Sequence, residues 1–122
     1  WESPDFNEDM KKLLELGVDA NMPDHDGDTA LFMVSQNGDI EIVRLLLEAG
    51  ADPNIHKTPP IQTPLMAASA QGHIEIVRML LDAGAKVETL DEDGWSAIMY
   101  ARMQDNMDIV EMLRREAPRL YH

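Results

Sequence analysis

The sequence predicts an all-α solenoid, a stack of helix pairs in which each pair packs only against its neighbours. One block recurs three times, starting at Thr29, Thr63 and Ser96, at offsets of 34 and 33 residues. The copies read TALFMVSQNGDIEIVRLLLEAG, TPLMAASAQGHIEIVRMLLDAG and SAIMYARMQDNMDIVEMLRREA. Each copy carries the residues that start and stop two helices, and each is too apolar to bury its faces alone. Repetition at this period is typical of stacked arrays.

The block from Thr63 to Gly84 shows how each copy specifies its two helices. Thr63 is an N-cap residue, and Pro64 suits the first turn of a helix. Gly72 can adopt the left-handed conformation that ends the first helix. Ile74 begins a second helix that is apolar over much of its surface, and Gly84 ends it.

Residues 1–23 hold an incomplete copy. Phe6, Met10, Leu13, Leu14 and Gly17 match the second helix of a unit, but no first helix precedes them. Terminal units of an array have one side that faces water, so their sequences are atypical. We expect Trp1 and Phe6 to cover that exposed end.

With these repeated blocks the chain resembles the ankyrin repeat family. The resemblance rests on TAL, TPL and SAI at the first-helix starts, on DIEIVRLLLEAGADPN and HIEIVRMLLDAGAKVE, and on the pairs Asp26–Gly27 and Asp93–Gly94. It implies helix-turn-helix units joined by β-hairpin-like fingers in a right-angled, L-shaped stack. We therefore expect a single domain, residues 1–122, made of a partial repeat 1–23 and repeats 24–57, 58–90 and 91–122.

Several positions depart from the family pattern. Residues 51–62 form a finger one residue longer than its counterpart, and Pro59–Pro60 followed by Ile61 replace the Asp-Gly turn, so this finger cannot make the same hairpin. It is either a neutral insertion or a specificity element. Phe32, Met66 and Met99 occupy the position where the family usually has His, and we interpret all three as buried packing residues. Asp105 replaces the glycine between two helices, a conformationally costlier choice.

The composition limits the possible functions. The formal charge of −13 disfavours nucleic acid and anionic membranes and favours a basic partner, although an acidic surface can also simply aid solubility. The chain has no Cys, so disulfides and thiolate metal sites are excluded. No apolar run is long enough to span a membrane. We predict no cofactor, and we take the cytoplasm as the default compartment.

Three motifs that could indicate other chemistry are interpreted differently. Asp24, Asp26 and Asp28 lack the Gly and Glu that an EF-hand loop requires, so we interpret them as turn and cap residues, with no metal predicted. The four histidines are scattered, and no catalytic motif is present, which predicts a non-enzyme. Asn21 and Asn54 have the spacing seen in ankyrin repeats that asparaginyl hydroxylases modify, but a hydrogen-bonding role within the fingers is the simpler interpretation.

The family resemblance also implies where a partner would bind. Partners of ankyrin-like arrays commonly occupy the concave face, which is formed by the finger tips and the first helices. We expect Trp95 and Tyr100 to be apolar anchors there, although Trp95 could instead pack on the neighbouring finger. The predicted partner-binding residues are His25, Asp26, Asp28, Met33, Gln36, Asn37, Gln62, Gln71, Glu92, Asp93, Trp95, Tyr100, Met103 and Gln104.

The function predicted from the sequence is therefore non-catalytic protein–protein interaction. In this interpretation a monomeric scaffold presents an acidic concave face to a protein with a basic segment. Two alternatives remain open at this stage. The chain could be an inhibitor or regulatory subunit of an enzyme that uses the same face, or a passive spacer within a larger protein.

Overall fold

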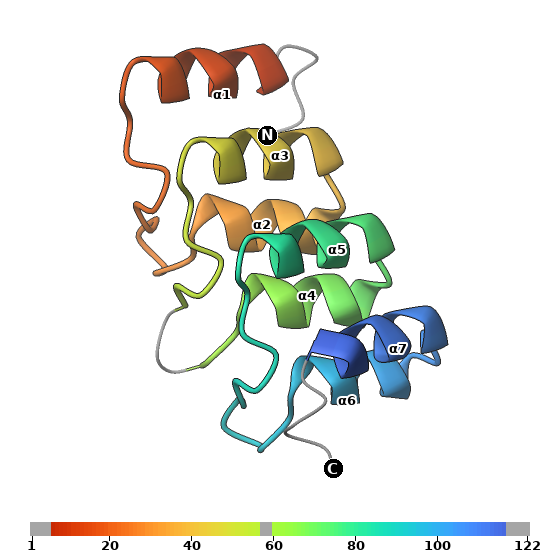
Figure 1. The fold of residues 1–122 in the computed structure, drawn as a ribbon. Helices are drawn as coiled ribbons and strands as arrows, with labels where there is room; N and C mark the ends of the chain where they lie inside the picture. The colour runs from red at the N-terminus through yellow and green to blue at the C-terminus, as the bar shows by residue number, and fades with distance from the viewer. Residues whose placement is uncertain (1–5, 57–59, 117–122) are drawn as a thin grey trace.

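The computed structural model describes residues 6–56 and 60–116, which form seven helices in two layers (Figure 1). Trp1, Pro59 and the side chain of Phe6 lie outside what it describes. The helices are α1 (Phe6–Glu15), α2 (Ala30–Asn37), α3 (Ile40–Glu48), α4 (Pro64–Gln71), α5 (Ile74–Asp82), α6 (Ala97–Met103) and α7 (Met107–Glu116). The described residues contain no strand, which confirms the predicted all-α class.

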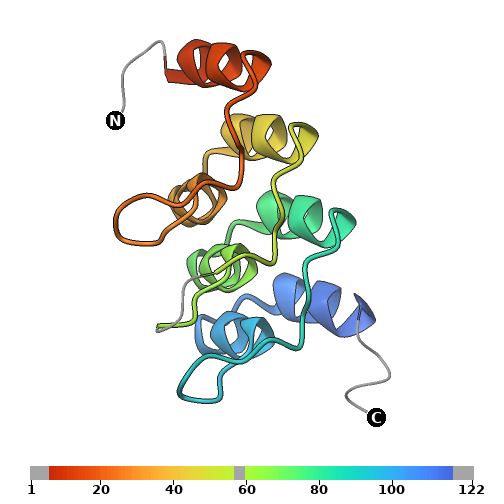
Figure 2. The same ribbon diagram turned by 90° about the vertical axis from the view of Figure 1, so that its left-hand side faces the viewer.

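The two layers consist of the first and the second helices of successive units (Figure 2). Helix α4 packs between α2 and α6 in one layer, while α1, α3, α5 and α7 follow one another in the other layer. The loops that connect successive units project to one side of the helices (Figure 1). This arrangement is the predicted solenoid, and it leaves the outward surfaces of α2, α4 and α6 beside the finger tips.

Side-chain caps fix where the first helices begin. The Thr29 Oγ1 atom accepts a hydrogen bond from the Phe32 N–H at 3.2 Å, and Thr63 Oγ1 accepts one from the Met66 N–H at 3.1 Å. Gly38 ends α2 with a φ angle of 85°. Asp105 is the one non-glycine residue of the described chain with a positive φ, 61°, so it adopts the costly conformation that its position requires.

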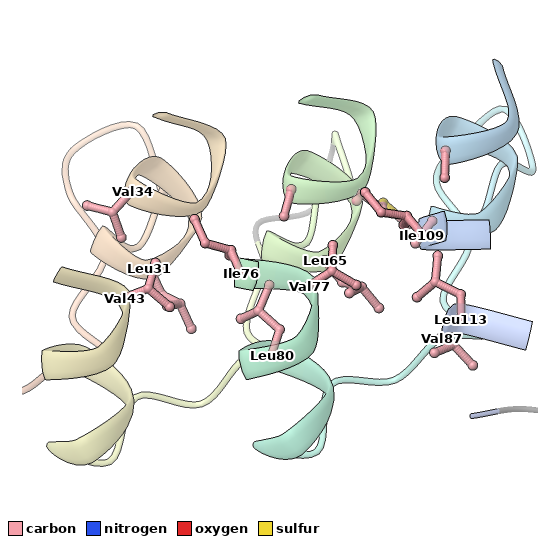
Figure 3. Close-up of a cluster of buried hydrophobic side chains, with 14 of the residues drawn as sticks. Leu31, Val34, Val43, Leu65, Ile76, Val77, Leu80, Val87, Ile109 and Leu113 are labelled. Carbon is pink, nitrogen blue, oxygen red and sulfur yellow. The ribbon is translucent and has the colours of Figure 1, made fainter. Parts of the chain in front are cut away.

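The core runs without a break through the stack. Ile42, Val43, Leu46, Ile76 and Leu80 project from the second helices and are almost completely buried. Equivalent side chains of the first helices meet them between the layers, as Figure 3 shows for Leu31, Val34 and Leu65. Each helix pair therefore completes the burial of the next one, as the repeat pattern predicts.

Polar bridges join the fingers of successive units. The Asn21 side chain donates to the Gly50 carbonyl at 3.4 Å and accepts from the Asp52 N–H at 2.6 Å. Asn54 repeats this arrangement one unit later, on the Gly84 carbonyl (3.0 Å) and the Lys86 N–H (2.8 Å). These bonds support the interpretation of both asparagines as hydrogen-bonding residues of the fingers.

A second set of polar bridges links successive units at the other end of the helices, where a short turn joins the two helices of each unit. The His73 Nε2 atom lies 3.2 Å from the Gln36 carbonyl, and the Asn106 side chain donates to the Ser69 carbonyl at 3.5 Å. The imidazole of His73 lies directly against Gly38, where an added Cβ would be 2.6 Å from Cε1. Gly38 is thus required both for its backbone conformation and for space.

Replacing Gly38 by alanine is expected to destabilise the fold more than replacing Gly50. Both glycines have a positive φ, so each alanine costs about 1–2 kcal/mol of backbone strain. Only at Gly38 does the new methyl group also collide with His73, which adds about 1–3 kcal/mol of overpacking. Urea unfolding of the two variants measures the difference. In a His73→Ala background, most of the difference in stability between Gly38→Ala and Gly50→Ala should disappear. Equal losses of stability for the two variants in the wild-type background would contradict the predicted collision.

One predicted core position is wrong. Phe32 and Met66 are buried as expected, but Met99 is 40% exposed. Its side chain folds back instead, and its sulfur accepts a hydrogen bond from the Ser96 N–H at 3.4 Å. Helix α2, which carries Phe32, is followed in its layer by α4, and α4, which carries Met66, is followed by α6. In the described chain no first helix follows α6, which carries Met99. The side chain therefore has less neighbouring surface against which it can be buried.

Candidate protein-binding face

The predicted partner-binding residues occupy equivalent positions in successive units, and all of them are exposed or half-buried. The positions just before the first helices hold Asp28, Gln62 and Trp95. Within α2, α4 and α6, three further sets of equivalent residues follow: Met33, Ala67 and Tyr100; Gln36, Ala70 and Met103; Asn37, Gln71 and Gln104. The repeat thus places the same four positions side by side along the face formed by the finger tips and the first helices, the face that the resemblance predicted to be concave and that is called the concave face below.

These sets enclose an open hollow over α4. It is open to solvent, has a volume of about 100 Å³, and is lined by Phe32, Gln36, Gln62, Met66, Ala67, Ala70, Gln71 and Tyr100. Its position has a simple cause, because α4 carries Ala67 and Ala70 where α6 carries the larger Tyr100 and Met103. Large side chains of α2 and α6 therefore stand on either side of two short ones.

Trp95 and Tyr100 form one aromatic unit beside this hollow. Their ring centroids are 5.3 Å apart and their planes are tilted by 47°, a common arrangement for aromatic pairs. Both side chains are half-buried, so part of each ring is accessible. Trp95 therefore contacts Tyr100, a side chain of the same face, and both rings are partly accessible.

Asp91 holds this aromatic unit in place. The Tyr100 hydroxyl donates a hydrogen bond to Asp91 Oδ2. That bond, partial burial and the charges of Asp91, Asp93 and Glu92 raise the pKa of Tyr100 to about 12. Partial burial alone would raise the pKa of the Asp91 carboxyl, but hydrogen bonds from Tyr100 and from two backbone N–H groups outweigh it, so that pKa is lowered. At neutral pH the pair is therefore a neutral phenol on a carboxylate.

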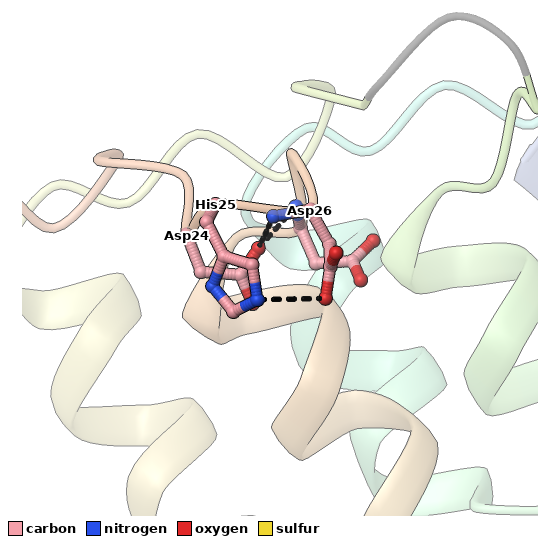
Figure 4. Close-up of polar contacts among 4 residues, drawn as sticks. Asp24, His25 and Asp26 are labelled. Atoms are coloured by element: carbon pink, nitrogen blue, oxygen red, sulfur yellow. Dashed lines mark hydrogen bonds and ion pairs between the residues drawn. The ribbon is translucent and has the colours of Figure 1, made fainter.

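Asp91 also shapes the finger tip, and Asp24 does the same one finger earlier. Asp91 Oδ1 accepts from the N–H groups of Asp93 and Trp95, both at 2.9 Å. Asp24 Oδ1 accepts from the N–H groups of Asp26 and Asp28 at 2.9 and 3.0 Å (Figure 4). In each tip the first aspartate closes the turn, so the carboxylates of Asp26 and Asp93 remain directed to solvent.

The carboxylates of Asp24, Asp26 and Asp28 lie close enough to share a cation, with ligand atoms within 4.8 Å of one another. The turn geometry accounts for this proximity, because Asp24 bonds the backbone of the other two. The finger with Asp91 builds the same turn with Trp95 in the place of Asp28. The cluster is thus explained by the turn, and the prediction that it holds no metal stays a prediction.

The middle finger is tied to the following one. The Ile61 N–H donates to both carboxylate oxygens of Glu92, at 2.9 and 2.8 Å. Glu92 therefore has a structural partner within the chain, which the sequence analysis did not foresee. Residues 57–59, which include the start of its turn, lie outside the described residues, so the prediction that this finger makes a different hairpin stays a prediction.

The family model for ankyrin repeats, three copies, matches residues 3–91 and 49–119. The chain belongs to the ankyrin repeat family. It is 33% identical over 110 residues to a protein of Rickettsia bellii described as an ankyrin repeat protein, covering 85% of this chain and 31% of that one.

Two further relatives are much longer than the region they share with this ankyrin repeat chain. An ankyrin repeat protein of fowlpox virus is 39% identical over 49 residues, covering 40% of this chain and 7% of its own length. The glycerophosphocholine phosphodiesterase gde1 of Schizosaccharomyces pombe is 33% identical over 112 residues, covering 92% of this chain and 10% of the enzyme. The chain thus spans less than a third of each of these relatives.

Family membership gives the broad function. Ankyrin repeats generally mediate protein–protein interaction, and the family is generally non-catalytic. No helix in the described parts of the chain, residues 6–56 and 60–116, is long and apolar enough to cross a membrane. His73 is engaged in the bridge between inter-helix turns.

The hollow brings together only some of the predicted residues. Gln36, Gln62, Gln71 and Tyr100 line it, whereas His25 lies at a finger tip, 3.5 Å from the Asp26 carboxylate. Asn37, Met103 and Gln104 are exposed near the far ends of their helices. Asp91 and Ala67 were not among the residues predicted from the sequence. Asp91 could have been found from its match with Asp24, and Ala67 from its match with Tyr100.

Proposed function

We propose that this ankyrin repeat chain binds another protein through its concave face, and that the partner contributes a basic segment. The observation that carries the proposal is the combination, on one face, of a hollow with an apolar floor and two acidic finger tips. Residues 24–28 and 91–95 each contain three carboxylates and neither contains Lys or Arg. Such a surface attracts a basic segment and repels other acidic proteins.

The charges of the second helices support this choice of face. Arg78 lies 3.9 Å from Glu75, and Arg114 and Arg115 each lie 3.6 Å from Glu111 on the same helix. Arg44 is likewise paired with Glu41. Acidic and basic groups thus alternate on the outer layer, while carboxylates gather at the finger tips. The two finger tips, which carry acidic residues without Lys or Arg, therefore contribute strongly to the net charge of −13, and they lie on the same face as the hollow and the aromatic pair.

Neutralising the outward carboxylates is expected to weaken partner binding without disturbing the fold. Asp26→Asn with Asp93→Asn removes two charges, but it leaves Asp24 and Asp91, which close the turns. A matched control, Glu48→Gln with Asp82→Asn, removes two charges from exposed ends of second helices. Each variant is immobilised and used to capture proteins from a lysate of the source organism, and the amount of partner recovered is compared at low and at high salt.

The first variant should recover markedly less partner than the control, and the difference should shrink as salt screens the charges. Recovery that is equal for both variants at low salt would contradict an acidic binding face. If the recovered partner is an enzyme whose activity falls on binding, the chain acts as an inhibitor or regulatory subunit. If nothing binds to the wild-type chain, the spacer alternative is favoured.

A further inference from the structure

We propose that the segment bound on the concave face is extended and places one apolar side chain in the hollow over α4, with a basic residue about three positions to either side. This inference rests on the proposed function and adds the form of the bound segment to it. It follows from three features of the face: the floor of the hollow, the amides around it, and the spacing of the acidic tips.

The floor of the hollow is apolar and sized for a single side chain. Met66, Ala67 and Ala70 of α4 form it, and the Tyr100 ring closes one side. Met66 is buried, whereas Ala67 and Ala70 are half-buried, so their methyl groups are accessible from outside. A leucine-sized side chain would cover these methyl groups and the edge of the ring, which is the main source of affinity in such a contact.

Primary amides surround this apolar floor. The side chains of Gln36, Gln62 and Gln71 line the hollow, and they make no hydrogen bond within the part of the chain that the structure describes. Each amide offers both a donor and an acceptor, which matches the N–H and C=O groups of a peptide backbone. An extended segment has these groups free, because it forms no internal hydrogen bonds. The rim therefore suits an extended backbone better than a helix.

The repeat spacing sets the distance between the recognised residues. The acidic tips 24–28 and 91–95 belong to the units of α2 and α6, on either side of the α4 hollow. Neighbouring packed helices lie about 8–10 Å apart, and an extended chain advances about 3.3 Å per residue. One unit thus corresponds to about three residues of the bound segment. Basic residues about three before and three after the apolar one would lie opposite the two tips.

Selection from a displayed library of random peptides, with the purified full chain as target, tests this form of segment. Enriched peptides are then measured by fluorescence polarisation against wild type, Ala70→Met and Ala49→Met. Ala70→Met fills the hollow with the residue that α6 carries at the equivalent position, Met103, so the fold should tolerate it. Ala49→Met is the matched control, because Ala49 is exposed at the end of α3, away from the hollow.

We expect enriched peptides to share an apolar residue with Arg or Lys about three positions on each side. Ala70→Met should weaken their binding at least about tenfold, and Ala49→Met should leave it unchanged. Basic peptides that bind Ala70→Met as tightly as wild type would overturn the hollow inference while the acidic face survives. Peptides without basic residues, unaffected by Asp26→Asn with Asp93→Asn, would overturn both. The absence of any enriched peptide would overturn recognition of an extended segment.

Discussion

Replacing Leu80 by alanine is expected to lower the free energy of unfolding by about 2–5 kcal/mol, a large part of the stability of a domain of this size. Leu80 is 0% exposed and lies on α5, which packs against α3, α4 and α7. Truncating it removes apolar contacts and leaves a cavity in the middle of the stack. Because each helix pair depends on its neighbours, this loss also weakens the attachment of the units on both sides.

Urea unfolding followed by far-ultraviolet circular dichroism measures the effect of Leu80→Ala. Leu16→Ala provides the control, because Leu16 is 81% exposed and its truncation should change stability by less than about 0.5 kcal/mol. If the two variants unfolded at similar urea concentrations, the second helices would not share a continuous core. The same comparison therefore tests the stacked arrangement as well as the burial of one residue.

Truncating both aromatic residues of the concave face is expected to produce the largest loss of partner binding. Trp95 and Tyr100 contact each other, stay half-buried and stand next to the hollow, which are properties of interface anchors. The double variant Trp95→Ala, Tyr100→Ala should therefore lose about 2 kcal/mol or more of binding free energy. Isothermal titration with the recovered partner measures it, after circular dichroism has confirmed that the variant is folded.

Two controls separate anchoring from support of the finger. Met107→Ala truncates an exposed apolar side chain on the outer helix α7 and should leave binding unchanged. Tyr100→Phe keeps the ring but removes the hydroxyl that donates to Asp91. If Tyr100→Phe loses as much binding as the double variant, the hydrogen bond that positions the finger matters more than the aromatic surface. If the double variant binds as wild type does, the aromatic pair is only a packing element.

Most of the fold could be predicted from the sequence because its signals are local and repeated. Thr63, Pro64 and Gly72 mark the ends of α4 by their own conformational and capping preferences. Thr29 and Gly38 mark the two ends of α2 in the same way. The period of the repeat then predicts which helices are neighbours. No information about distant contacts was needed for these inferences, since each unit packs on the next one along the chain.

The details of the candidate site depend on contacts between different helices and fingers, which local signals do not specify. The hollow exists because Ala67 and Ala70 stand between larger residues of α2 and α6. The bonds from Tyr100 to Asp91 and from Ile61 to Glu92 join residues 9 and 31 positions apart. Met99 was expected to be buried by analogy with Phe32 and Met66, but in the described chain no first helix follows α6, whereas α4 follows α2 and α6 follows α4. Equivalent positions therefore differ in burial when their neighbours differ.

Backbone amide chemical shifts of the isotope-labelled chain, recorded with and without the recovered partner, test the central claim most directly. The account predicts that the largest changes fall in residues 24–28, 62–71 and 91–104, which make up the finger tips and the first helices of the concave face. Changes confined to α3, α5 and α7, residues 40–48, 74–82 and 107–116, would place the partner on the outer layer and contradict it.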